Sequence, residues 1–304
     1  MKLFDPQLSR IRTLLFGAMA FVWFSEMMLW GFQTLSKMWT NTWIIASEDA
    51  HLAMALYITH SVHAPAKGAL GVMAVYGLMS KNPFTRAALF VSMALVPPLN
   101  LAFPFRAQGF PLAWVVIPTT LSVILWGSFF AFKEPIRQPD QGQASGAGQS
   151  PSSPWEAFQY FWFAANSAAL TVLASLFLFW PTTALNLVHP CFSSWLNAEP
   201  GQVSSLVYSG MATGTHLLAL AVASWIATVY CRSQPTLRRA VAAVSTVHAG
   251  LFIIFPLRQI TTELGGSCAT ASILFAFVLL FVGWLLYAAF SHRVERSGQE
   301  VQRG

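Results

Sequence analysis

Two stretches of this chain match each other at a fixed spacing. Residues 82–106 read NPFTRAALFVSMALVPPLNLAFPFR, and residues 234–258, 152 positions later, read QPTLRRAVAAVSTVHAGLFIIFPLR. Each stretch begins with a side-chain amide followed by proline, ends in Phe-Pro-x-Arg, and has an apolar segment of equal length between these landmarks. A motif that returns in the same register predicts one structural unit used twice. The duplication predicts architecture, but it does not say what the protein does.

The composition excludes an ordinary soluble domain. Of the residues, 55% are hydrophobic and 9% charged, whereas about a quarter are charged in a typical soluble domain. Apolar runs of about 20 residues, long enough for a helix to cross a bilayer, recur along the chain. A membrane barrel would instead show alternating segments of about 10 residues. We therefore expect an all-α integral membrane protein with eight transmembrane helices, at about residues 12–32, 52–79, 86–105, 112–132, 157–180, 205–230, 239–257 and 269–290.

The charges predict the orientation of these helices. If all eight cross the membrane, most basic residues share one side, and the opposite loops hold only Lys37, Arg106 and Arg258. Because positive residues stay inside, both termini are expected in the cytoplasm of a multi-pass protein of the cell inner membrane. The net charge of +6 is then explained as a signal that orients the helices during membrane insertion. The expected partner is the lipid bilayer, and binding to nucleic acid is not expected. The clustered basic residues are Lys2, Arg10, Arg12, Lys81, Arg86, Lys133, Arg137, Arg232, Arg238, Arg239, Arg293 and Arg296.

Residues 134–154 divide the chain into its two predicted units. They are rich in Gln, Gly, Ser and Pro, a composition typical of a flexible linker. The flanking units, residues 1–133 and 155–304, would each hold four helices. With an even number of crossings, both units enter and leave on one side, so the two four-helix repeats are expected to be parallel.

Three polar residues are expected at one depth in the first unit. Glu26, Lys67 and Asn100 each lie 14 residues from a basic residue at the cytoplasmic boundary, which places them about 21 Å above that boundary. Ionisable side chains at such depth are costly and are usually retained for a reason. They are either a structural ion pair with an amide partner or the polar floor of a ligand pocket. In the second unit Lys67 and Asn100 correspond to Ala219 and Phe252.

The two arginines of the repeated motif have two possible roles. Arg106 and Arg258 close the outer ends of the third and seventh helices, where a cation is favoured by the helix dipole. Alternatively, they form a pair of anion clamps. Pro97 and Pro98, within the third helix, predict a kink there because they remove backbone donors.

Three histidines are candidate cofactor ligands. His63 and His216 fall within one position of each other in the two copies and near the outer boundary, while His248 lies roughly 9 Å lower. A haem held by two histidines needs both rings at one depth on facing helices. Hydrogen bonds between helices are the alternative role for each histidine.

These features predict a protein that binds or transports a small or amphipathic ligand through an outward-facing pocket. Glu26, Lys67 and Asn100 would form the floor of this pocket, and Arg106 and Arg258 its rim. One alternative is a membrane redox or biosynthetic enzyme that uses haem or quinone, with His63, His216 and His248 as ligands. Another is an accessory subunit of a membrane complex, bound to protein partners. Phosphate-loop, nucleophile-elbow and zinc-protease motifs do not occur in the sequence.

Overall fold

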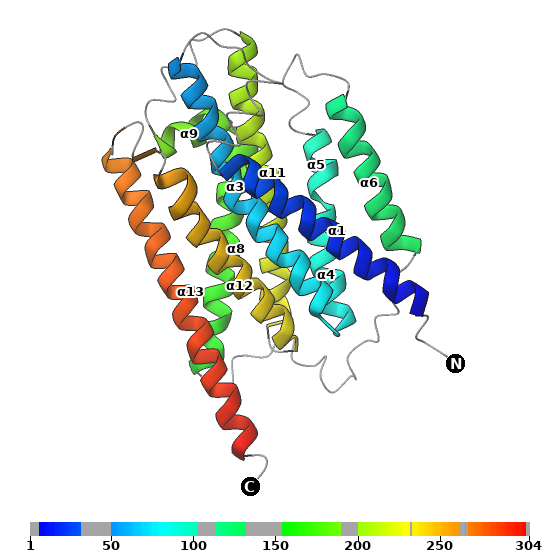
Figure 1. The fold of residues 1–304 in the computed structure, drawn as a ribbon. Helices are drawn as coiled ribbons and strands as arrows, with labels where there is room; N and C mark the ends of the chain where they lie inside the picture. Colours follow the sequence, from blue (N-terminus) through cyan, green and yellow to red (C-terminus); the bar gives the residue numbers. More distant parts are fainter. Residues whose placement is uncertain are drawn as a thin grey trace.

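The computed structural model describes residues 6–31, 50–102, 113–131, 154–189, 200–231, 233–258, 260–261, 265 and 267–301. Within these ranges every regular element is a helix and none is a strand (Figure 1). The predicted all-α class is therefore confirmed. The helices are α1 (Pro6–Gly31), α3 (Ala50–Met79), α4 (Pro83–Ala94), α5 (Val96–Ala102), α6 (Ala113–Ala131), α8 (Pro154–Phe179), α9 (Pro181–Val188), α11 (Pro200–Val229), α12 (Pro235–Phe252), the π-helix η2 (Ile253–Leu257) and α13 (Cys268–Val301).

Five segments of the described chain are long and apolar enough to cross a membrane. Two shorter helical stretches, Thr13–Leu29 and Thr119–Phe129, are apolar as well. These helices suit a protein embedded in a membrane in several passes. The five segments are Pro83–Ala102, Pro154–Phe179, Val207–Val229, Pro235–Leu257 and Thr270–Ala288.

The two copies of the repeated motif both start a helix. Asn82 caps α4, since its Oδ1 accepts hydrogen bonds from the backbone N–H groups of Phe84 (2.9 Å) and Thr85 (3.2 Å). Gln234 stands at the same point of α12 and makes no side-chain cap. In both helices proline occupies the first turn, where its missing N–H is not needed.

Both of these helices change geometry before their carboxy-terminal ends. The regular helix is interrupted at Leu95, between α4 and α5, just before Pro97 and Pro98, so the predicted kink is present. In the second copy the winding widens into η2, which contains Pro256. A proline inside a helix removes one hydrogen bond, and a π-turn is one way to accommodate that loss.

Helices α3 and α11 form the centre of the molecule. They pack against each other, α3 also against α1, α4 and α12, and α11 also against α4, α8 and α9. Helices α6 and α13 lie at opposite edges (Figure 1). Glycines allow the close approach of α11 to its neighbours, because a Cβ on Gly214 would lie 2.7 Å from Leu178 of α8. Small residues at helix contacts are the usual means of tight packing in membranes.

Hydrogen bonds join α8 to α11 inside this packing. The hydroxyl of Ser167 lies 2.9 Å from that of Ser224 and 3.2 Å from that of Thr228. Near the surface, Nε1 of Trp225 donates to the hydroxyl of Thr171. Such polar contacts are effective between helices in lipid, where water does not compete for them.

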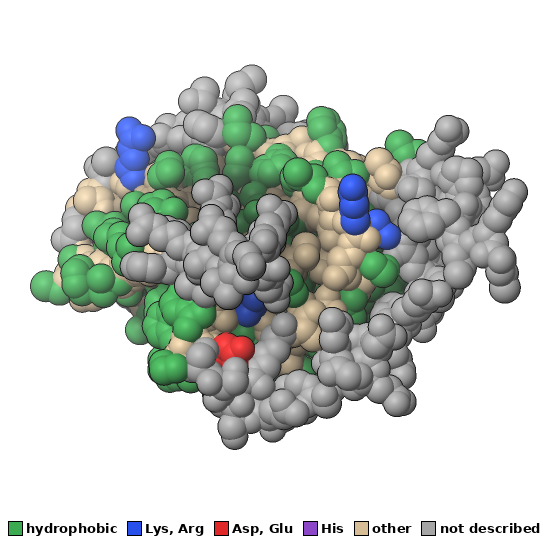
Figure 2. Space-filling model, turned by 90° about the horizontal axis from the view of Figure 1, so that it is seen from below, with side chains coloured by type: hydrophobic (Ala, Val, Ile, Leu, Met, Phe, Trp, Pro, Cys, Tyr) green, Lys and Arg blue, Asp and Glu red, His purple; other side chains and the backbone are tan. Residues whose placement is uncertain are grey.

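Hydrophobic side chains also cover much of the outer surface. Figure 2, seen from the lower side of Figure 1, shows them spread over the described surface with few charged groups among them. On α13 alone, Phe275, Leu279 and Leu286 are exposed. A helix that is apolar on its outer face is stable when that face meets lipid.

Candidate functional site

The amino-terminal half contains an ion pair between two helices. Nζ of Lys67 on α3 contacts the carboxylate of Glu26 on α1. The Lys67 side chain is 8% exposed and that of Glu26 is 39% exposed. The structure therefore brings together two of the residues singled out in the sequence, and the carboxylate is the accessible member of the pair.

Two histidines lie beside this ion pair. The rings of His63 on α3 and His216 on α11 are both buried, and their centroids are 6.3 Å apart. Electrostatic interactions join His216 to both Glu26 and Lys67. We call Glu26, Lys67, His63 and His216 the polar centre.

Local contacts fix the orientation of both rings. Nδ1 of His216 hydrogen-bonds to the backbone carbonyl of Ala212, one helical turn earlier. The His216 ring also packs edge-on against Trp23 of α1, with centroids 5.4 Å apart. Nδ1 of His63 lies 3.5 Å from the hydroxyl of Ser209. A carbonyl bonded at Nδ1 sets the ring orientation and leaves Nε2 for other partners.

Asn100 is joined to α11 by a hydrogen bond. Its Oδ1 accepts a hydrogen bond from the hydroxyl of Thr215, at 2.6 Å. Thr215 directly precedes His216, so Asn100 is tied to the helix that supplies the second histidine. The three polar residues of the first half thus converge on α11 of the second half.

The contribution of α11 to the surroundings of Glu26, Lys67 and Asn100 was not predicted from the sequence. The residues concerned are Tyr208, which interacts electrostatically with Glu26, and Ser209, Ala212 and Thr215, which share a polar stripe with the predicted candidate His216. Their spacing of one, four, seven and eight positions from Tyr208 places all of them on one helix face. That periodicity could have revealed a polar stripe. Treating the two halves as separate bundles concealed it, because the stripe faces the other half.

Of the two predicted rim arginines, only Arg258 belongs to the part of the chain that the structure describes. Arg106 lies outside the described residues. Arg258 is exposed at the end of η2. The nearby ring of Phe255 packs against Gly31 of α1. The anion-clamp role of the pair stays a prediction.

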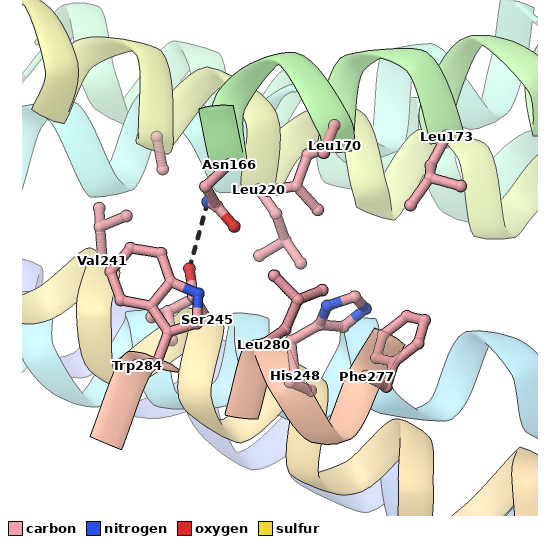
Figure 3. A pocket seen from close by; sticks show the side chains of 14 residues that line it. Asn166, Leu170, Leu173, Leu220, Val241, Ser245, His248, Phe277, Leu280 and Trp284 are labelled. Carbon is pink, nitrogen blue, oxygen red and sulfur yellow. Dashed lines mark hydrogen bonds between the residues drawn. The ribbon is translucent and has the colours of Figure 1, made fainter. Parts of the chain in front are cut away.

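His248 belongs to a different place from the other histidines. It lies on α12, and its ring contacts Phe252 and Phe277. With side chains of α8, α11, α12 and α13 it lines a cavity of about 50 Å³ to which neither His63 nor His216 contributes (Figure 3). The three histidines therefore do not form one ligand set.

The described residues contain no group of three or more His, Cys, Asp or Glu side chains arranged to hold a metal ion. In comparisons with known proteins, no family model, curated protein or solved structure matches the chain.

Proposed function

We propose that this protein binds and transports a small or amphipathic zwitterion at the polar centre. The observation that carries this proposal is the ion pair between Lys67 and Glu26, enclosed by apolar helices and next to His216. Ionisable side chains within transmembrane segments are costly and mark ligand and ion pathways.

The charges of the site define the class of ligand. A purely cationic ligand would bind Glu26 and leave Lys67 buried without its counter-ion, and a purely anionic one would leave Glu26 unpaired. An uncompensated buried charge costs several kcal/mol, on the order of 3–5. A zwitterion inserted between the two keeps both charges compensated. Since Glu26 is the more accessible residue, the positive group of the ligand arrives first at the carboxylate.

The arrangement of the helices supports a doubled scaffold for this site. We propose eight transmembrane helices in two parallel four-helix repeats, residues 1–133 and 155–304, joined by the linker 134–154. The contacts occur in matched pairs: α1 with α3 and α8 with α11, α3 with α12 and α11 with α4, α5 with α6 and α12 with α13. The central contact between α3 and α11 would lie on the pseudo-twofold axis.

This scaffold gives the polar centre a way to open. In our proposal both termini are cytoplasmic, in the cell inner membrane, and the pocket faces outward. Ligands of duplicated transporters are bound where the repeats meet, and one repeat moves against the other. Glu26 and Lys67 belong to one repeat, while His216 belongs to the other. A relative movement of the repeats would therefore change the surroundings of the ion pair.

Four probes of matched size test the ligand class. They are β-alanine (zwitterion), propylamine (cation), propionate (anion) and 1-propanol (neutral), each also carried on an octyl chain. Thermal unfolding in nanodiscs is the readout, because a ligand that binds only the folded state raises the melting temperature. We expect the zwitterions to stabilise the protein most. The Glu26→Gln/Lys67→Met variant should lose this effect, and Lys81→Met, at an exposed position, should keep it.

Equal shifts from all four head groups, or shifts that persist in Glu26→Gln/Lys67→Met, would refute the assignment of the site. Uptake of labelled β-alanine or its octyl derivative into proteoliposomes then separates transport from binding alone. Binding without uptake would indicate a receptor.

One observation favours a second candidate, a redox or biosynthetic enzyme with haem or quinone. His63 and His216 approach each other from facing helices, as two axial haem ligands must. Purified protein with a Soret band that His216→Ala abolishes would support this candidate. The position of His248 removes it from such a pair.

A further inference from the structure

The cavity in the carboxy-terminal half combines an apolar wall with a few polar groups. Leu170, Leu173 and Leu220 form one part of the wall, and Phe277, Leu280 and Trp284 another (Figure 3). The polar groups are those of Asn166, Ser245 and His248. A space of about 50 Å³ has room for more than one water-sized group.

Two of these polar groups have bonding capacity left over. Nδ2 of Asn166 lies 2.9 Å from the hydroxyl of Ser224 and 3.4 Å from that of Ser245. These contacts use both of its N–H groups, while its carboxamide oxygen points into the cavity (Figure 3). His248 is 7% exposed; its ring packs against the rings of Phe252 and Phe277 and makes no hydrogen bond to the described residues. A buried polar group without a hydrogen bond costs about 1–3 kcal/mol, so this pair of groups favours a bound partner.

The cavity reaches the outside of the helix bundle. Ala169 lines it and is itself exposed, and Leu173 and Leu280 are partly exposed. These three residues belong to α8 and α13, whose spans are the least buried of the five candidates. Near the other end of the same helices, Trp155 stacks on Tyr287 and Trp162 meets Trp284. The exposed edge of the cavity between α8 and α13, beyond these aromatic contacts, therefore gives a ligand a way in from the hydrophobic surround.

We propose that this cavity binds the hydroxyl end of a lipid-soluble alcohol or phenol. The hydroxyl proton is donated to Oδ1 of Asn166, and the hydroxyl oxygen accepts from the ring N–H of His248. One hydroxyl thus satisfies an acceptor and a donor at once. The apolar body of the molecule lies against Phe277 and Leu280 and extends to the lipid between α8 and α13.

The polar groups are specific to this half. The residues 152 positions before Ser245 and His248 are Met93 and Val96, which are buried among apolar neighbours. A residue needed for the packing of the helices would be expected at the corresponding position in both copies of a duplicated unit. These two polar residues therefore belong to the cavity rather than to the shared packing.

A photoreactive alcohol tests the proposal. We choose 3-azioctanol, which carries a diazirine near its hydroxyl, with protein in nanodiscs and adducts mapped by mass spectrometry. Adducts are expected on Phe277, Leu280 and Leu173. An excess of 1-octanol should reduce them at least fivefold, whereas octyl methyl ether, which cannot donate a hydrogen bond, should leave them nearly unchanged.

Three variants give the test its control. His248→Phe keeps a ring but removes the nitrogens, and Ala223→Leu fills the cavity without changing a polar group. Both should abolish labelling at the three residues, while Tyr230→Phe, at the exposed end of α11, should label as the original chain does. If one of the two cavity variants fails to fold, its lowered melting temperature reveals this. Labelling of the other cavity variant then tests the proposal.

Two results would overturn the proposal. One is labelling spread evenly over lipid-facing residues and unaffected by the variants. The other is equal competition by the alcohol and the ether, which would mean that donation of a hydroxyl proton to Asn166 does not contribute to binding. Neither result bears on the polar centre, because no residue is shared between the two sites.

Discussion

Asn82 and Gln234 stand 152 positions apart, the offset of the repeated motif, and they hydrogen-bond to each other. Nδ2 of Asn82 donates to Oε1 of Gln234, at 2.8 Å. Each residue begins the third long helix of its half of the chain, so the two equivalent positions meet. The same Asn82 side chain caps α4 through its oxygen, which gives it two separable roles.

Substitutions at these two positions should separate capping from cross-linking. Gln234→Ala removes only the hydrogen bond and should cost about 0.5–1.5 kcal/mol of unfolding free energy. Asn82→Ala removes the cap as well and should cost about 0.5–2 kcal/mol more. Unfolding in a denaturing detergent measures both. The double variant should be more stable than the sum of the single effects predicts, and strict additivity would show that the bond contributes nothing.

Breaking the Lys67–Glu26 ion pair from one side should destabilise the protein more than removing it altogether. Glu26→Ala leaves the Lys67 ammonium buried without its counter-ion, and we expect a loss of about 3 kcal/mol, at the lower end of the usual range because Glu26 is partly exposed. Glu26→Gln/Lys67→Met should recover most of this loss. Thermal unfolding in nanodiscs is the measurement. A double variant as unstable as Glu26→Ala would contradict this account.

The close contact of α8 with α11 should not tolerate a methyl group at Gly214. A Cβ there would lie 2.9 Å from the backbone nitrogen of Leu178 and 3.0 Å from the carbonyl oxygen of Ala174, and backbone atoms cannot rotate away. Gly214→Ala should therefore cost about 1–3 kcal/mol. Gly127→Ala is the matched control, since a Cβ on Gly127 meets nothing within 4 Å. It should be neutral or stabilise by about 0.5–1 kcal/mol, because alanine favours the helix.

The cavity in the carboxy-terminal half should distinguish two alanines of α11. Ala223 lines the cavity, so the larger side chain of Ala223→Leu has space to enter and should change the unfolding free energy by less than about 1 kcal/mol. Ala221 is fully buried and does not line the cavity. Ala221→Leu should cost about 1–3 kcal/mol through overpacking. Equal losses of unfolding free energy in the two variants would mean that the side chains around Ala223 leave no space for a leucine.

The all-helical fold could be predicted from the sequence for a simple reason. Continuous apolar runs of about 20 residues have few alternatives to a helix in lipid, because each backbone polar group must be satisfied within its own segment. Eight runs are predicted to cross the membrane, and five segments of the described chain are long and apolar enough to do so. The kink before Pro97 was predictable on the same local ground, the missing N–H of proline.

The ion pair was predictable only in part. Counting residues from the basic boundary placed Glu26 and Lys67 at one depth, because the rise of a helix is constant. Counting residues gives the position of a side chain along the helix axis but not the direction in which it points. It therefore could not show that Glu26 and Lys67 face each other. It also gave no reason to join them to His216, whose helix lies in the other half of the chain.

The sequence by itself determined the helices and their apolar character, since these depend on neighbours along one segment. Only the tertiary structure decided the rest. In the tertiary structure α3 packs against α11, and His216 and Thr215 lie near Glu26, Lys67 and Asn100. His248 lies instead in the cavity between α8, α11, α12 and α13. These outcomes depend on the rotation of each helix about its axis and on where glycines permit close approach, and both are set by contacts between segments far apart in the chain.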